Sequence, residues 1–206
     1  MKTKESDPIT SSVSRLEVTN IWEKTGMQAL EHLIEEYNNG YTQTKHIMPF
    51  PKEMFRVTED FQTGDVFQRA LIADTFLDFK DTVTGLEEII ASEADYLLST
   101  RRKNGVGGWS YFPGLPELSP DADDLAQVMQ VMLRAGYREQ TSPLFETPLK
   151  VLLEEQANDT AWETWIVPKH NKSEEQELQT EWINTAWGTG SDIEVVANLI
   201  YALILY

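Results

Sequence analysis

The 206-residue sequence contains no cysteine, which excludes disulfide bonds, thiolate nucleophiles and cysteine-bound zinc. It also has no stretch of about 20 uncharged apolar residues, so no membrane-spanning helix is expected. Basic residues are scarce, because 17 lysines and arginines stand against 34 aspartates and glutamates, for a net charge of −17. Nucleic acids and anionic membranes would repel such a chain, and neither is expected as a partner. The three histidines have no partner at metal-ligand spacing, so we expect no metal and no cofactor.

Apolar residues make up 41% of the chain, enough to bury a core. Segment 1–14 is polar and lacks the apolar stretch of a secretory signal, so we interpret it as a disordered leader. We assign residues 15–206 to one helical domain and expect a cytoplasmic protein.

The spacing of apolar residues predicts an all-α fold. Segment 41–63 holds Pro49 and Pro51 and no sustained period, which predicts a loop. The only β-prone tetrapeptides, 109–112 and 164–167, are bounded by glycine or proline, so no sheet is expected. Helices are predicted at about 21–39, 65–79, 84–100, 121–135, 147–156, 173–184 and 192–206.

A repeat runs through three of these helices. The segments DVFQRALI, DADDLAQV and DIEVVANL each begin with aspartate, at 65, 121 and 192, and carry alanine five residues later before an apolar tail. Aspartate suits an N-cap, and a recurring alanine lets neighbouring helices approach closely. We infer three helical hairpins, each pairing an outer amphipathic helix with an inner, more apolar one.

The second and third repeats resemble a known superfamily. GVGGWSYFP followed by PDADDLAQVMQVMLRAG is similar to a repeat of squalene-hopene cyclases and class II terpene cyclases, and GSDIEVVANLIYALILY resembles a later repeat. The similarity covers about 64–206, but the glutamine of the family's Gln-Trp repeats is missing before Trp109. The resemblance implies an α/α toroid of about six hairpins. With three inner helices the chain would form a partial barrel, completed by a missing second half or by self-association.

The run Asp121-Ala122-Asp123-Asp124 is the sharpest chemical signal. The resemblance implies proton-initiated cyclisation of an isoprenoid, with Asp123 as the general acid and with Asp121 and Asp124 orienting it. Carboxyl groups crowded in an apolar cavity cannot all ionise, so one keeps its proton. The alternative is ordinary capping, because acids in the first turn complement the helix dipole. We assign the equivalent Asp65 and Asp192 to capping.

Aromatic residues near this run are the candidate substrate contacts. Trp109, Tyr111, Phe112 and Trp165 could stabilise carbocations by cation–π attraction, or could simply pack loops between hairpins. The basic triplet at 101–103 could meet a diphosphate, and a solvated helix end explains it equally well.

Two rival functions stay open beside the cyclase. One is a non-catalytic helical-repeat module that binds a lipid or a protein partner. The other is a carbohydrate-active α/α barrel, for which Asp159 and Glu163 form no convincing pair. Either way, the apolar helix at 192–206 needs cover on both sides, so we expect the chain to associate.

Overall fold

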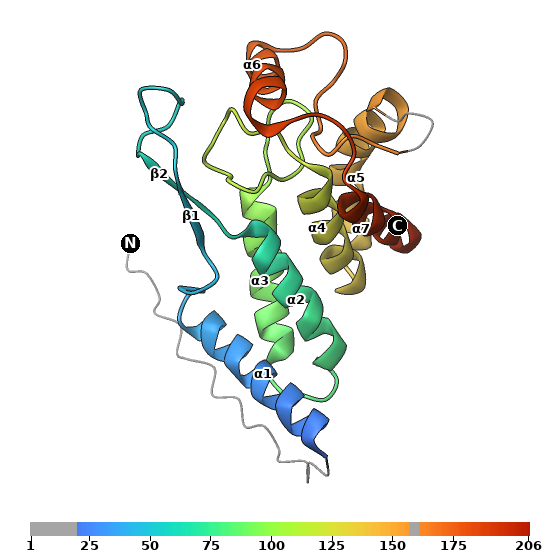
Figure 1. Ribbon diagram of the computed structural model, residues 1–206. Helices are drawn as coiled ribbons and strands as arrows, with labels where there is room; N and C mark the ends of the chain where they lie inside the picture. Colours follow the sequence, from blue (N-terminus) through green and yellow to red (C-terminus); the bar gives the residue numbers. More distant parts are fainter. Residues whose placement is uncertain (1–19, 157–160) are drawn as a thin grey trace, which may run out of the picture.

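The computed structural model describes residues 20–156 and 161–206 (Figure 1). The predicted leader at 1–14 and Asp159 lie outside the described residues. A π-helical turn extends α5 (η1, Val151–Gln156) and another extends α6 (η2, Ile183–Trp187). The α-helices are α1 (Ile21–Asn38), α2 (Val66–Phe79), α3 (Leu86–Thr100), α4 (Ala122–Arg134), α5 (Arg138–Lys150), α6 (Glu174–Trp182) and α7 (Ile193–Leu205).

A small sheet corrects the predicted all-α fold. Strands β1 (His46–Pro49) and β2 (Phe61–Gly64) pair antiparallel inside the segment predicted to be a loop, and the fold is mixed α/β. Pro49 was taken as evidence against a strand. It is the last residue of β1 and lies opposite Phe61 in a two-stranded ribbon, where a missing N–H is tolerated.

The predicted partial α/α toroid is not clearly present either. Helix α4 packs between α2 and α7, and α3 packs on α2, so the described helices form an open row (Figure 1). The three helices that follow Asp65, Asp121 and Asp192 are thereby neighbours in the order α2, α4, α7. Within residues 20–156 and 161–206, no helix has the length and apolar composition needed to cross a bilayer.

The core is centred on α4, in which every residue from 122 to 132 except Asp123 is buried. Around it pack Trp109 and Phe145, both fully buried. A second cluster joins α1 to α2 and α3, and a third joins Phe50, in the loop between the two strands, to Phe112 and the rest of the 109–120 loop. Helix α7 contributes much less, since only Leu199 and Ala202 on it are buried.

Helix starts test the predicted caps. Asp192 caps α7 by accepting a hydrogen bond from the Glu194 backbone N–H at 2.8 Å, as predicted. Asp65 makes no capping bond to α2 and instead accepts the Tyr96 hydroxyl, so its assignment to capping was wrong. Helix α5 begins at 138 and not at 147 as predicted. Pro148 lies inside this helix and does not mark its start.

Candidate functional site

Two loops cover the first turn of α4. The Asp121 backbone N–H donates to the Trp109 carbonyl at 3.0 Å, and the Ala122 N–H donates to the Thr164 carbonyl at 2.8 Å. Asp121 and Trp165 also form an isolated antiparallel bridge. The start of α4 is therefore held between the 109–120 loop and the 161–167 segment, away from water.

Two of the three aspartates form a buried pair. The Asp121 carboxylate accepts the Asp124 backbone N–H at 2.8 Å, and the exposed fractions of the two residues are 6% and 1%. Burial raises the pKa of Asp121 to about 6. Burial, and then the charge of Asp121, raise the pKa of Asp124 well above its ordinary value. Both shifts favour the protonated form of the pair.

Capping explains Asp121 but not Asp124. Both carboxyl oxygens of Asp124 are buried, and neither accepts a hydrogen bond from a donor group among the described residues; their remaining polar neighbour is the Asp121 carboxyl. Leaving a buried polar group unsatisfied costs about 1–3 kcal/mol, so an ordinary helix start would not place a carboxyl there. One turn further on, the buried amide nitrogen of Gln127 is also without a partner in the described part of the chain.

Asp123 points elsewhere and is only partly buried. Its carboxylate accepts the Asn198 amide N–H at 2.6 Å, and the Asn198 side-chain oxygen accepts from Gln130. Burial raises the pKa of Asp123, while the bond from Asn198 acts in the opposite direction. Asp123 thus contacts α7, whereas Asp121 and Asp124 interact with each other. Its predicted role as the general acid stays a prediction.

All four predicted aromatic contacts pack against other rings. Trp109 is fully buried and donates its indole N–H to the Leu97 carbonyl at 2.6 Å. Phe112 is buried in the third cluster, with Phe50, and Trp165 lies 5.6 Å from Trp187 between ring centroids. Their predicted contact with a substrate remains a prediction, and each already has a packing role.

Tyr111 differs from the other three because its hydroxyl belongs to a polar cluster. The hydroxyl accepts the Gln68 side-chain N–H and lies 3.2 Å from Nδ1 of His46. Burial, with a further contribution from the Asp124 charge, raises the pKa of Tyr111. The sequence gives no signal that joins His46 or Gln68 to this cluster, since neither lies near the aspartates in the chain.

Arg102, the middle residue of the basic triplet at 101–103, has a structural role. Arg102 donates to the Ser110 hydroxyl at 2.7 Å and to the carbonyl oxygens of Leu115, at 2.6 Å, and Leu118. These bonds fix the loop that covers α4. The guanidinium is occupied by protein oxygens, which leaves it poorly placed to meet a diphosphate.

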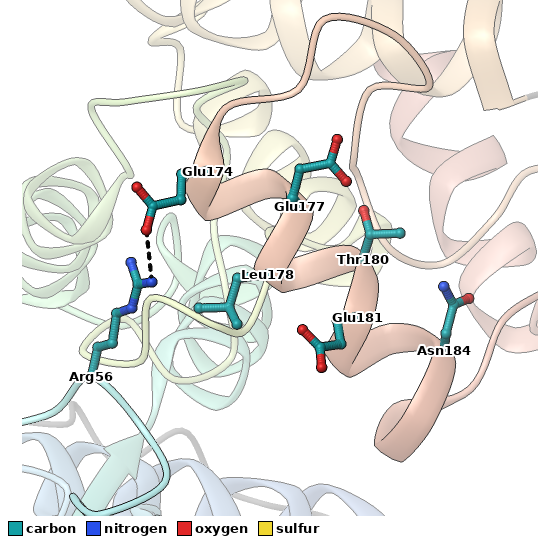
Figure 2. Close-up of a pocket in the computed structure, with 7 residues that line it drawn as sticks. All are labelled: Arg56, Glu174, Glu177, Leu178, Thr180, Glu181 and Asn184. Carbon is teal, nitrogen blue, oxygen red and sulfur yellow. Dashed lines mark hydrogen bonds and ion pairs between the residues drawn. The ribbon is translucent and has the colours of Figure 1, made fainter.

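A separate groove lies on α6, away from the aspartates (Figure 2). Its volume is about 490 Å³, and Figure 2 shows Arg56 reaching Glu174 across one end, at 3.0 Å. Glu177 and Glu181 add two further carboxylates to the lining. This groove is open and acidic, so it does not provide the apolar enclosure that an isoprenoid needs. In the described part of the chain, no group of three or more histidine, aspartate or glutamate side chains could hold a metal ion.

Comparison with family models, curated proteins and solved structures found no match to this chain.

Proposed function

We propose that this chain is a class II terpene cyclase-like protein that starts cyclisation of an isoprenoid by protonating it, with the Asp121–Asp124 pair as the proton source. The observation that supports this most is the buried Asp124 carboxyl, whose two oxygens accept no hydrogen bond from a donor group among the described residues. A carboxyl kept protonated in a dry site is the reagent that alkene protonation requires.

The Asp121–Asp124 pair and Asp123 would have different roles in the reaction. The π electrons of the substrate form the new C–H bond with the carboxyl proton, which leaves a carbocation on the substrate and a carboxylate on the pair. Asp123, whose carboxylate is held by Asn198, adds negative charge nearby that favours the cation. This proposal moves the acid from Asp123 to its neighbours, since Asp123 is only partly buried and is held by the Asn198 amide, whereas Asp121 and Asp124 are buried.

Deuterium incorporation tests the proposal. The purified full chain is incubated in D2O with squalene and, separately, with linear prenyl diphosphates. We expect a cyclised product that carries one deuterium at the protonated carbon. Failure to cyclise any of these substrates, or cyclisation without deuterium, would overturn the proposal.

Matched amide variants locate the acid. Asp124→Asn keeps the side-chain shape but has no proton to deliver to carbon, so we expect it to lose turnover by a factor of about 100 or more. Asp123→Asn should keep partial turnover, because it removes only a nearby charge. If Asp123→Asn alone abolishes turnover, Asp123 is the acid, as the sequence predicts.

A second candidate, a non-catalytic module that binds a lipid or protein partner, is favoured by the surface of α7. Ile193 and Ile204 on this helix are 84% and 75% exposed, and Tyr201 is exposed as well. Exposed apolar side chains gathered on one helix are typical of a binding surface. Under this hypothesis no substrate would be cyclised, and substitutions on α7 would weaken binding while the aspartate variants would not.

A further inference from the structure

A hollow of about 180 Å³ lies where α2 and α4 end and α3 begins, at the opposite end of α4 from the aspartate pair. Leu77 and Ile90 are its innermost residues, because both are buried in the second core cluster. Ala91 on α3 and Ala135 at the end of α4 form part of its wall. Since α3 and α4 both pack on α2, the short side chains at these two positions leave the space between the helices unfilled.

The rim of this hollow carries one positive and one negative side chain. Lys80 directly follows α2, and Glu87 lies in the first turn of α3. They make no ion pair with each other, and neither has a hydrogen bond or an ion pair with any other residue in the described part of the chain. Two opposite charges that line one small hollow and do not pair with each other are complementary to a ligand that carries both signs.

From this arrangement we infer that the hollow binds a free α-amino acid with an apolar side chain, as its zwitterion. The carboxylate of the ligand accepts a hydrogen bond from the Lys80 ammonium, and the ammonium of the ligand donates to the Glu87 carboxylate. Its apolar side chain lies against Leu77 and Ile90. Small-molecule sites have this composition, with mainly apolar lining and a few polar groups that fix orientation.

The size of the hollow separates this inference from the proposed function. A volume of about 180 Å³ suits a ligand of about the size of leucine and is too small for a long isoprenoid. The hollow and the aspartate pair also lie at opposite ends of α4. Amino-acid binding here therefore holds or fails independently of any cyclisation.

Titration of the isotope-labelled full chain with L-leucine, followed by nuclear magnetic resonance, tests the inference. We expect saturable shifts of the backbone amides that surround the hollow, with a dissociation constant on the order of 1 mM for a ligand this small. Absence of saturable shifts at these amides up to about 50 mM leucine would overturn the inference.

Two analogues of leucine separate the two charges. Leucinamide keeps the ammonium and lacks the carboxylate, whereas isocaproate keeps the carboxylate and lacks the ammonium. We expect each to bind about tenfold or more weakly than leucine, because each loses one charge-assisted hydrogen bond. If leucinamide binds as tightly as leucine, the hollow recognises an amine alone, such as a peptide N-terminus, and the inference is wrong. Equally tight binding of isocaproate would overturn it in the same way.

Matched variants assign each charge to its residue. Lys80→Met keeps most of the aliphatic chain, so it should weaken leucine and isocaproate by about tenfold and leave leucinamide unchanged. Glu87→Gln should weaken leucine and leucinamide and leave isocaproate unchanged. Glu88→Gln removes the same charge from an exposed neighbour that does not line the hollow, and should change none of the three.

The pattern across the three ligands distinguishes recognition from damage to the fold. A variant that weakens all three ligands alike has changed the shape of the hollow and not one charge, and that outcome would contradict the assignment of its residue. Unchanged leucine binding in both Lys80→Met and Glu87→Gln would overturn the inference.

Discussion

Helices α4 and α7 begin with the same capping chemistry and end up with different electrostatics. Asp121 accepts the N–H of Asp124, and Asp192 accepts the N–H of Glu194, each at 2.8 Å. The first aspartate is 6% exposed, whereas Asp192 and Glu194 are both exposed. Only the buried pair acquires strongly raised pKa values. The comparison teaches that the capping motif is not itself a signal of acid chemistry, which depends on what covers it.

The covering differs because α4 is enclosed on both sides. Helices α2 and α7 flank it, and the Trp109 and Thr164 carbonyls close over its first turn. Helix α7 is packed on one side by α4, and its opposite side carries exposed Ile193 and Ile204. The enclosed start of α4 and the exposed start of α7 should therefore respond differently to matched changes.

The largest difference in stability is expected between variants of two loop tryptophans. Trp109 is fully buried and bonded to the Leu97 carbonyl, whereas Trp162, in the 161–167 segment, is only partly buried. Trp109→Ala should lower the free energy of unfolding by about 3–5 kcal/mol. Trp162→Ala should lower it by about 1–2 kcal/mol, since less area leaves water there. Urea unfolding followed by circular dichroism measures both, and equal losses would contradict the contrast between the two loops.

The pH dependence of stability should come from the start of α4. The folded pKa of Asp121, about 6, lies above its ordinary value of 3.8, so between these pH values the folded state binds more protons than the unfolded state. Stability from this group therefore rises as pH falls through 6. Going from pH 7 to pH 5 should add about 1–2 kcal/mol from Asp121 alone, and Asp124 acts in the same direction.

Two variants show which residues cause this dependence of stability on pH. The double variant Asp121→Asn with Asp124→Asn should lose the gain between pH 7 and pH 5, as measured by urea unfolding at each pH. Asp192→Asn, the matched change on exposed α7, should keep it. If the double variant gains as much stability as the unmodified chain, the carboxyl pair is ionised and the proposed acid is absent.

The helices were largely predictable because their signals are local. The predicted helix at 121–135 corresponds to Ala122–Arg134, and the one at 173–184 begins at Ser173 with a capping box, as the sequence suggests. The ribbon was missed because its pairing is made by backbone groups of two short segments, which side-chain spacing does not reveal. Pro49 and Pro51 favoured a loop in segment 41–63, and that prediction was wrong.

The site was only half predictable from the sequence. The run at 121–124 marks carboxyl groups, but the burial of Asp124 depends on carbonyls more than ten residues away along the chain, at Trp109 and Thr164. His46 is further still from the aspartates. One feature of the sequence does indicate a polar contact. Asn198 interrupts the apolar run between Val195 and the end of α7, and its amide donates to Asp123.

Removing the two N-caps should change the free energy of unfolding by less, and the two losses should depend on pH differently. Asp192→Ala should lower the free energy of unfolding by about 1 kcal/mol at both pH 7 and pH 5, the usual effect of losing an N-cap. Asp121→Ala removes a cap and also an acid that is costly to ionise in the folded state. Its loss should therefore be smaller at pH 7 than at pH 5, as urea unfolding at the two pH values would show. A loss from Asp121→Ala that is the same at both pH values would mean that burial does not distinguish the two caps.

The smallest effect on stability is expected on the outer side of α7, together with a change in association. Ile204 is 75% exposed, so Ile204→Lys should change the free energy of unfolding by no more than about 0.5 kcal/mol. The same change places a charge among Ile193, Ile200 and Tyr201, and should reduce the self-association that these exposed apolar residues favour. Light scattering and binding of a hydrophobic dye measure this. Gln43→Lys adds the same charge at an exposed position outside α7 and should leave association unchanged, which separates the apolar surface from net charge as the cause. If the unmodified chain is monomeric at micromolar concentration and binds no dye, the exposed side of α7 is not an association surface.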